Sequence, residues 1–125
     1  MAFGSSNVME VTCQSLTINY CNFTGNTPFS NNWRSFGGAL FAKLSQILIT
    51  NTCFIQNINY NGAAIYLEQH EKYTLLSGSL TNIIALNNFA YGESGFSYFS
   101  SGLLSFNILV ENCIFEGNYA VGGIN

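Results

Sequence analysis

The sequence predicts an all-β fold, a parallel β-solenoid of about four coils with 30 or 31 residues in each coil. The first observation is a nine-residue pattern: an aliphatic residue, an Asn two positions later, a Phe three further and an Asn three further. Its copies follow one another at intervals of 31, 31 and 30 residues, and such periods are typical of solenoids. The second observation is that β-branched and aromatic residues alternate with Asn, Thr and Ser, which favours strands over helices. The four copies lie at 18–26, 49–57, 80–88 and 110–118.

The first element expected in each coil is a short strand that small residues precede. "FGGALF" at 36–41, "NGAAIY" at 61–66 and "ESGFSY" at 93–98 share this arrangement, and "VGGIN" at 121–125 repeats its start. Glycine adopts positive φ values, and a Cβ atom at these positions would collide with the coil above or below. These stretches therefore predict a strand that is entered through a tight turn.

The second element is a strand that ends at the first Asn of the pattern. We expect its aliphatic residue to point into the solenoid and its Asn to form a corner, because Asn tolerates the left-handed conformation that a bend requires. The expected corner residues are Asn51, Asn82 and Asn112, with Tyr20 in the first coil. The expected inward aliphatic residues are Ile18, Ile49, Leu80 and Val110.

The third element carries the Phe of the pattern and ends at its last Asn, where we expect a second corner. Phe23, Phe54 and Phe115 should fill the interior, with Ala85 at this position in the third coil. Stacked amide side chains should hydrogen-bond along the solenoid, and each bond contributes about 0.5–1.5 kcal/mol. The expected ladder residues are those of both Asn columns, namely Asn26, Asn57, Asn88 and Asn118, and Asn51, Asn82 and Asn112. A loop of variable length then leads to the next coil.

The words "GGAL", "FTGN", "FIQN" and "FEGN" resemble the GGA-aliphatic and Phe-x-x-Asn repeats of the polymorphic outer membrane protein family. That resemblance covers nearly the whole chain and implies a right-handed parallel β-helix of the pectin-lyase-like type. The third coil departs from the family pattern, because Ala85 replaces Phe, Ala63 replaces the second Gly and "ESGFS" matches it poorly.

Residues 1–125 are expected to form a single solenoid segment with an exposed strand edge and no polar cap at either end. Such a segment is either part of a longer solenoid, covered by flanking coils of the same chain, or one of several copies that stack head to tail. Cys21 and Cys113 share a column but lie about 14 Å apart in one chain, too far for a disulfide. Stacked copies would bring them within one coil of each other. The other interpretation is that both are buried apolar thiols.

The composition excludes several classes of function. Only 7% of the residues are charged and three are Lys or Arg, so a nucleic-acid partner is not expected. No apolar stretch reaches about 18 residues, so membrane insertion is not expected either. The chain contains no Asp, and its Glu residues are scattered. We therefore expect no enzyme and no cofactor, and interpret Glu68, His70 and Glu71 as a solvated loop tip rather than a metal site.

Three surface features remain. Asn22 begins an Asn-Phe-Thr glycosylation sequon, which is meaningful if the chain is secreted. Trp33, in the long loop, is a candidate contact between subunits, although it could also pack on its own coil. Aromatic residues could stack on glycans or merely cover strand faces. They are Tyr66, Tyr98 and Phe99.

These features together favour an extracellular or cell-surface structural protein. Its expected role is that of a subunit or segment of a fibre or filament, which associates with itself through its coil ends. The alternative is an adhesin, an autotransporter-like passenger that binds host proteins or glycans. A noncatalytic part of a polysaccharide-active β-helix enzyme is the third interpretation.

Overall fold

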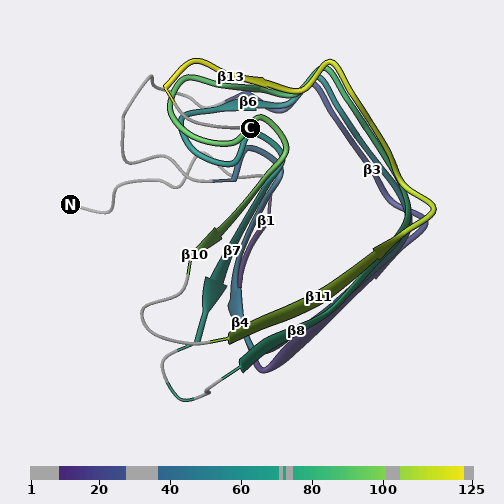
Figure 1. Cartoon of the computed structure of the whole chain (residues 1–125), viewed down its shortest axis with the longest axis vertical. Helices are drawn as coiled ribbons and strands as arrows, with labels where there is room; N and C mark the ends of the chain where they lie inside the picture. The colour runs from purple at the N-terminus through teal and green to yellow at the C-terminus, as the bar shows by residue number, and fades with distance from the viewer. Residues whose placement is uncertain (1–8, 28–36, 71, 73–74, 101–104, 123–125) are drawn as a thin grey trace.

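The computed structural model describes residues 9–27, 37–70, 72, 75–100 and 105–122. These residues form an all-β solenoid in which every paired strand is parallel to its neighbour, and they contain no helix (Figure 1). From β10 through β11 to β13 the chain turns counterclockwise in Figure 1 while later coils lie nearer the viewer, so the solenoid is right-handed. Two of its sheets have four levels, which corresponds to about three turns rather than the expected four coils.

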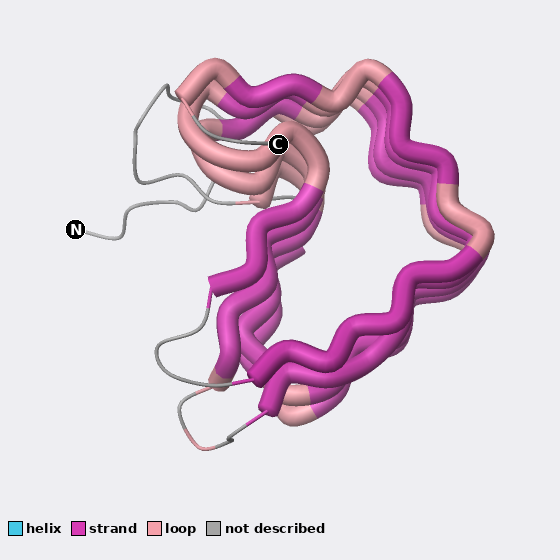
Figure 2. Tube along the Cα trace, in the orientation of Figure 1, coloured by secondary structure: helices cyan, strands magenta, loops and turns pink. Residues whose placement is uncertain are grey.

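Three sheets form the wall of the solenoid (Figure 2). The first sheet contains β1 (Met9–Thr12), β4 (Leu40–Leu44), β7 (Ile65–Gln69) and β10 (Ser97–Ser100). The second, which we call the bent sheet, contains β2 (Ser15–Asn19), β3 (Asn22–Thr24), β5 (Gln46–Ile55), β8 (Leu75–Leu86), β11 (Ser105–Glu111) and β12 (Ile114–Glu116). The third, the short sheet, contains β6 (Ile58–Asn59), β9 (Phe89–Ala90) and β13 (Tyr119–Ala120).

The strand register confirms the repeat that the sequence predicts. The Phe column has Phe23 opposite Phe54, Phe54 opposite Ala85 and Ala85 opposite Phe115. The aliphatic column pairs in the same way, and so do the strands that follow the small residues. The members of these two columns are Ile18, Ile49, Leu80 and Val110, and Leu40, Ile65 and Ser97.

The small residues before the first sheet have the predicted role. Gly37 has a φ of 62°, in the left-handed region. A Cβ atom on Gly38 would lie 2.2 Å from the carbonyl oxygen of Ala63 in the next coil. The turn therefore needs glycine for its backbone conformation and for the close approach of neighbouring coils.

The first corner lies where it was predicted, and the second does not. Tyr20, Asn51, Asn82 and Asn112 have φ values between 48° and 55°. At the second corner the left-handed residues come one position before the ladder asparagines, with φ between 53° and 68°. These residues are Gly25, Gln56, Asn87 and Gly117. The ladder asparagines follow the bend, and their side chains point inward instead of forming it.

The coil also has a side that the sequence did not predict. The two-residue strands of the short sheet lie directly after the ladder asparagines, where only a loop was expected. Strands this short carry no periodicity that a sequence pattern can reveal. Their register nevertheless continues that of the bent sheet, with Ile58 opposite Phe89 and Phe89 opposite Tyr119.

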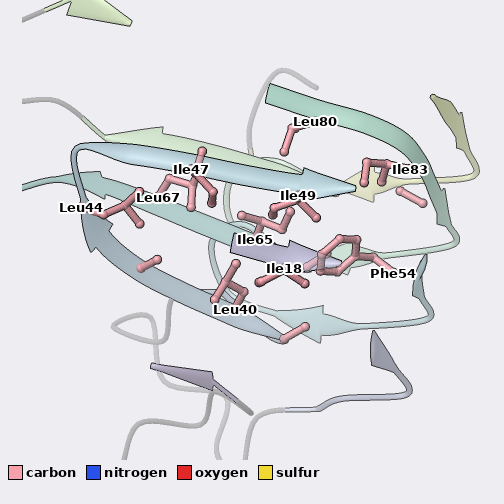
Figure 3. Packing of buried hydrophobic residues seen from close by; sticks show 14 of the residues in the cluster. Ile18, Leu40, Leu44, Ile47, Ile49, Phe54, Ile65, Leu67, Leu80 and Ile83 are labelled. Atoms are coloured by element: carbon pink, nitrogen blue, oxygen red, sulfur yellow. The ribbon is translucent and has the colours of Figure 1, made fainter. Parts of the chain in front are cut away.

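The interior is an apolar core that all coils share. Side chains of the first sheet and the bent sheet meet between them, among them Ile49, Ile65 and Phe54 (Figure 3). Val110 and Phe115 occupy the same inward columns in the last coil but are each 47% exposed. Their exposure arises because no described coil lies beyond them.

The third coil keeps its core filled although Ala85 stands at the Phe position. Phe96 reaches in from the turn before β10, at a position where the earlier coils have Ala39 and Ala64. The centre of its ring lies 5.8 Å from that of Phe54 and 4.8 Å from that of Phe115. The large and small residues have thus exchanged sides of the interior at this level.

Candidate functional site: amide ladders and coil ends

A buried amide ladder runs through all four levels of the solenoid. Asn26, Asn57 and Asn88 each donate from Nδ2 to Oδ1 of the next ladder residue, over 2.7, 2.9 and 2.7 Å. Their backbone N–H groups donate to the same oxygens over 3.0–3.2 Å. The last ladder residue is Asn118. The predicted ladder is therefore confirmed, and it has a direction, because donors point toward the later coil.

A third bond of each level ties the ladder to the Phe strand. Nδ2 of Asn57 also donates to the carbonyl oxygen of Phe23, over 3.0 Å, and Nδ2 of Asn88 donates to that of Phe54, over 2.9 Å. Asn57 and Asn88 are fully buried. A buried amide is costly unless both its donors and its acceptor are used, and these two side chains meet that condition.

The second predicted ladder lies on the outside, at the first corner, and is confirmed for Asn51 and Asn82. Asn82 donates from Nδ2 to Oδ1 of Asn51, and Asn51 donates to Oδ1 of Asn19, each over 3.0 Å. Thr50 adds a hydroxyl bond of 2.7 Å to the same oxygen of Asn19. Asn19 was missed from the sequence, because it lies one position before Tyr20, the residue that occupies the corner in the first coil.

The Phe column also points into the interior, three positions before the ladder asparagines in each coil. The rings of Phe23 and Phe54 stack with their centres 5.0 Å apart and an angle of 5° between their planes. The ring of Phe115 packs against Phe96. All three predicted Phe residues therefore face the interior.

The cysteines do not form disulfides, and all four are free. Cys21 lies over Thr52, whose Oγ1 accepts a bond from the Cys21 backbone N–H. Thr52 pairs with Ile83, and both are buried in the interior, which places Cys113 in the same inward column. Cys21 is exposed in the first coil and Cys113 partly exposed in the last.

The outer face of the first sheet carries an aromatic column. The rings of Phe41, Tyr66 and Tyr98 stack, with centres 5.4 and 5.0 Å apart and interplanar angles of 16° and 13°. Tyr66 is only 8% exposed, so its ring faces are not free to stack on a glycan. The expectation for Phe99 was wrong, because this ring packs against the interior cluster instead of covering the outer face.

Burial raises the pKa of the Tyr98 phenol above its usual value of 10.0. A side-chain hydrogen bond to Glu93 and the charge of that carboxylate raise the pKa further, because both oppose a phenolate.

The polar stretch at the end of β7 is not brought together as a metal site in the described residues, and Glu68 lies within the strand rather than in the expected loop tip. Glu68 pairs with Lys43, with 3.2 Å between Oε1 and Nζ. Nδ1 of His70 accepts a bond of 3.2 Å from the Lys72 backbone N–H, whereas Glu71 lies outside the described residues. The described residues contain no group of three His, Cys, Asp or Glu side chains that could hold a metal ion.

Two predicted surface residues have different outcomes. Trp33 lies outside the described residues. Asn22 is exposed on the outer face of β3, and its Oδ1 accepts a hydrogen bond of 2.5 Å from the Thr24 hydroxyl. The sequon therefore lies on the surface of the bent sheet, away from the interior.

No helix in the described part of the chain has the length and apolar character needed to cross a membrane.

Comparison with known proteins adds one distant similarity. The chain is 28% identical over 123 residues to part of "Metabotropic glutamate receptor-like protein P" of Dictyostelium discoideum. The aligned region covers 95% of this chain but 9% of that protein. No protein-family model matches the chain, and no solved structure matches it.

Proposed function

We propose that the chain is a structural β-solenoid of the cell exterior, a subunit or segment of a surface fibre that associates through its coil ends. The observation that carries this proposal is the buried amide ladder, which passes through every level without interruption from Asn26 to Asn118. A ladder of this kind resists shear between coils, because sliding one coil breaks three bonds per level. Stiffness along the axis is the property that a fibre requires.

The surface of the described coils also suits a fibre. Charged residues make up 7% of the whole sequence, so neighbouring fibres repel one another weakly. The outer faces of β2, β5 and β8 in the bent sheet are made of Ser, Thr, Asn and Gln with scattered aliphatic residues. These three strands present a repetitive uncharged surface, whereas the last coil adds the exposed Glu111 and Glu116.

An exterior location is supported by two further observations. The exposed sequon at Asn22 would be a usable acceptor in the secretory pathway. The similarity to a segment of a receptor-like protein is the second. We further infer that the coils are of the pectin-lyase-like type and related to polymorphic outer membrane protein repeats, on the basis of their right-handed parallel winding and the "GGAL" and Phe-x-x-Asn words.

The second candidate is an adhesin-like passenger that binds a protein or glycan, and the outer aromatic column favours it. Tyr98 is the last ring of the stack formed with Phe41 and Tyr66, and Glu93 lies beside it. A partner would contact the ring edges and this last ring, because both faces of Tyr66 are used within the stack. This candidate does not require the coil ends to associate.

Electron microscopy of the purified chain separates the two candidates. Four levels at about 4.8 Å each give a length of about 19 Å, so stacked copies should form rods with that axial repeat. Asn57→Ser should shorten or abolish the rods by interrupting the ladder, whereas Asn82→Ser, a matched change in the exposed ladder, should leave them intact. Isolated particles at all concentrations would contradict the fibre and leave the passenger as the better proposal.

A further inference from the structure

We propose that the last coil of one copy docks onto the first coil of a second copy, with Asn118 donating to Oδ1 of the second copy's Asn26. This inference rests on the proposed fibre function and names the contact that would build it. The ladder supplies the first argument, because its direction makes the two ends different and complementary.

At the last coil the ladder ends in donors. In each earlier level the backbone N–H and Nδ2 of the ladder residue both donate to the next Oδ1. Asn118 uses Oδ1 for Asn88 and one Nδ2 proton for the carbonyl oxygen of Ala85. Its backbone N–H and its second Nδ2 proton have no acceptor in the described residues and occupy the donor positions of the repeat.

At the first coil the ladder ends in an acceptor. Asn26 donates to Asn57 through its backbone N–H and Nδ2, and no described residue donates to its Oδ1. If a second copy continued the solenoid, this oxygen would accept the two Asn118 donors. The remaining Nδ2 proton of Asn26 would meet the carbonyl oxygen of Phe115, as Asn57 meets that of Phe23. One junction thus repeats all three bonds of an internal level.

The apolar columns supply the second argument. A hollow of about 420 Å³ opens at the last coil, lined by Leu80, Phe96, Val110, Phe115 and Asn118 among others. Within the solenoid the same columns are closed by the next aliphatic and aromatic residues, and Leu80 is only 2% exposed. In a stacked pair Ile18 and Phe23 of the second copy would close the columns of Val110 and Phe115.

The spacing of these groups explains why the occupant is a second copy. The open end requires a parallel strand edge that offers an aliphatic residue, a Phe five positions later and an Asn three positions after that. The first coil of this chain presents this combination as Ile18 on β2, Phe23 on β3 and Asn26 two residues after β3 ends. In the described residues each of these two strands pairs only with β5, so their outer edges can accept a neighbour.

Cysteines at the two ends provide a reporter of the contact. Cys113 and Cys21 lie in one inward column, so docking would place them one level apart, about 4.8 Å between strands, within the range that a disulfide spans. Oxidised glutathione can close this bond: two thiols lose two protons and two electrons, and one glutathione disulfide becomes two glutathione thiols.

The test mixes two variants of the full chain, each in a Cys13→Ser, Cys53→Ser background. One also carries Cys21→Ser and the other Cys113→Ser, so each has a single thiol at one end. With oxidised glutathione the mixture should form a covalent dimer. Either variant alone, in which both copies carry the same thiol, should form much less of it. A mixture that yields no more dimer than the separate variants would overturn the head-to-tail register.

Sedimentation velocity tests the ladder contact. Asn118→Ala and Asn26→Ala should each weaken association at least tenfold, whereas Asn107→Ala and Asn22→Ala, on the outer faces of the same coils, should change it less than twofold. Circular dichroism verifies that each variant keeps its β structure. Rods that persist unchanged in the ladder variants would overturn this contact and leave the fibre function standing. A wild-type chain that remains monomeric at high concentration would overturn both, and would assign the ends to flanking coils of a longer polypeptide.

Discussion

Exchanging Ala85 and Phe96 tests whether the third coil is a compensated version of the repeat. The structure places the Phe96 ring between Phe54 and Phe115, on the level where Ala85 leaves room. Ala85→Phe restores the residue type that the pattern has at this position, and Phe96→Ala restores the Ala found at Ala39 and Ala64. Each single change should destabilise the fold, and the double change should restore much of what is lost.

The expected sizes follow from the packing. Ala85 is fully buried, and a new ring there would occupy the space of Phe96, an overpacking that costs about 2–3 kcal/mol. Phe96→Ala opens a cavity, and we expect about 2–3 kcal/mol, less than a fully buried Phe, because Phe96 is partly exposed. In the double variant the new ring can stack on Phe54 as Phe23 does. Its net cost should stay below about 2 kcal/mol, a coupling of about 3 kcal/mol.

Urea unfolding of the four proteins measures these differences in the free energy of unfolding. Protein concentration must be held constant and low, so that association does not add to the apparent stability. Equal m-values would show that the same surface is exposed in each variant. A double variant whose loss equals the sum of the two single losses would refute the reasoning, because the two side chains would then not share one space.

Four further changes probe other features. Gly78→Ala should lower the free energy of unfolding by at least about 3 kcal/mol in a thermal melt, because its Cβ would lie 1.7 Å from a carbonyl oxygen of β5 at a φ of 150°. Asn57→Ala should cost about 2–4 kcal/mol in urea unfolding, because it leaves buried ladder groups without partners. The pKa of Tyr98 is raised, so the contribution of Tyr98 to the free energy of unfolding is fully present below pH 10 and is lost as the pH rises through the folded pKa. Glu93→Gln should lower that pKa in an absorbance titration, and an unchanged value would contradict the assigned cause. Secretion from a eukaryotic host should add one glycan, seen as a mass shift that Asn22→Gln removes.

The repeat could be predicted because residues of one column lie side by side and have similar side chains. The Phe, aliphatic and Asn columns all follow from chemical similarity at one spacing, and their register was predicted correctly. The first corner was predicted for the same reason, since Asn51 and Asn82 have both the residue type and the left-handed conformation. Where a column is chemically uniform, the sequence repeats the same residue type at the same structural position in each coil, and the pattern can be recognised.

The second corner could not be predicted in this way because its column is not uniform. Gly25, Gln56, Asn87 and Gly117 share a conformation and no chemistry, so the pattern drew attention to the Asn one position later. What the ladder position requires is a buried amide that can bond in two directions, as Asn57 does. A polar residue that recurs beside a bend is therefore ambiguous between the bend and the ladder until the direction of its side chain is known.

Phe96 explains why the third coil departs from the repeat. A solenoid coil must fill its interior, but the filling residue can come from either wall. Ala85 stands where the other coils have Phe, and the opposite wall supplies a ring from a position that elsewhere holds Ala, so "ESGFS" departs from the small-residue pattern at the same level. The two departures lie 11 residues apart in the sequence and count as two defects in a linear pattern, whereas in space they are a single exchange. Coils that deviate from a repeat should accordingly be judged in pairs of facing positions rather than one column at a time.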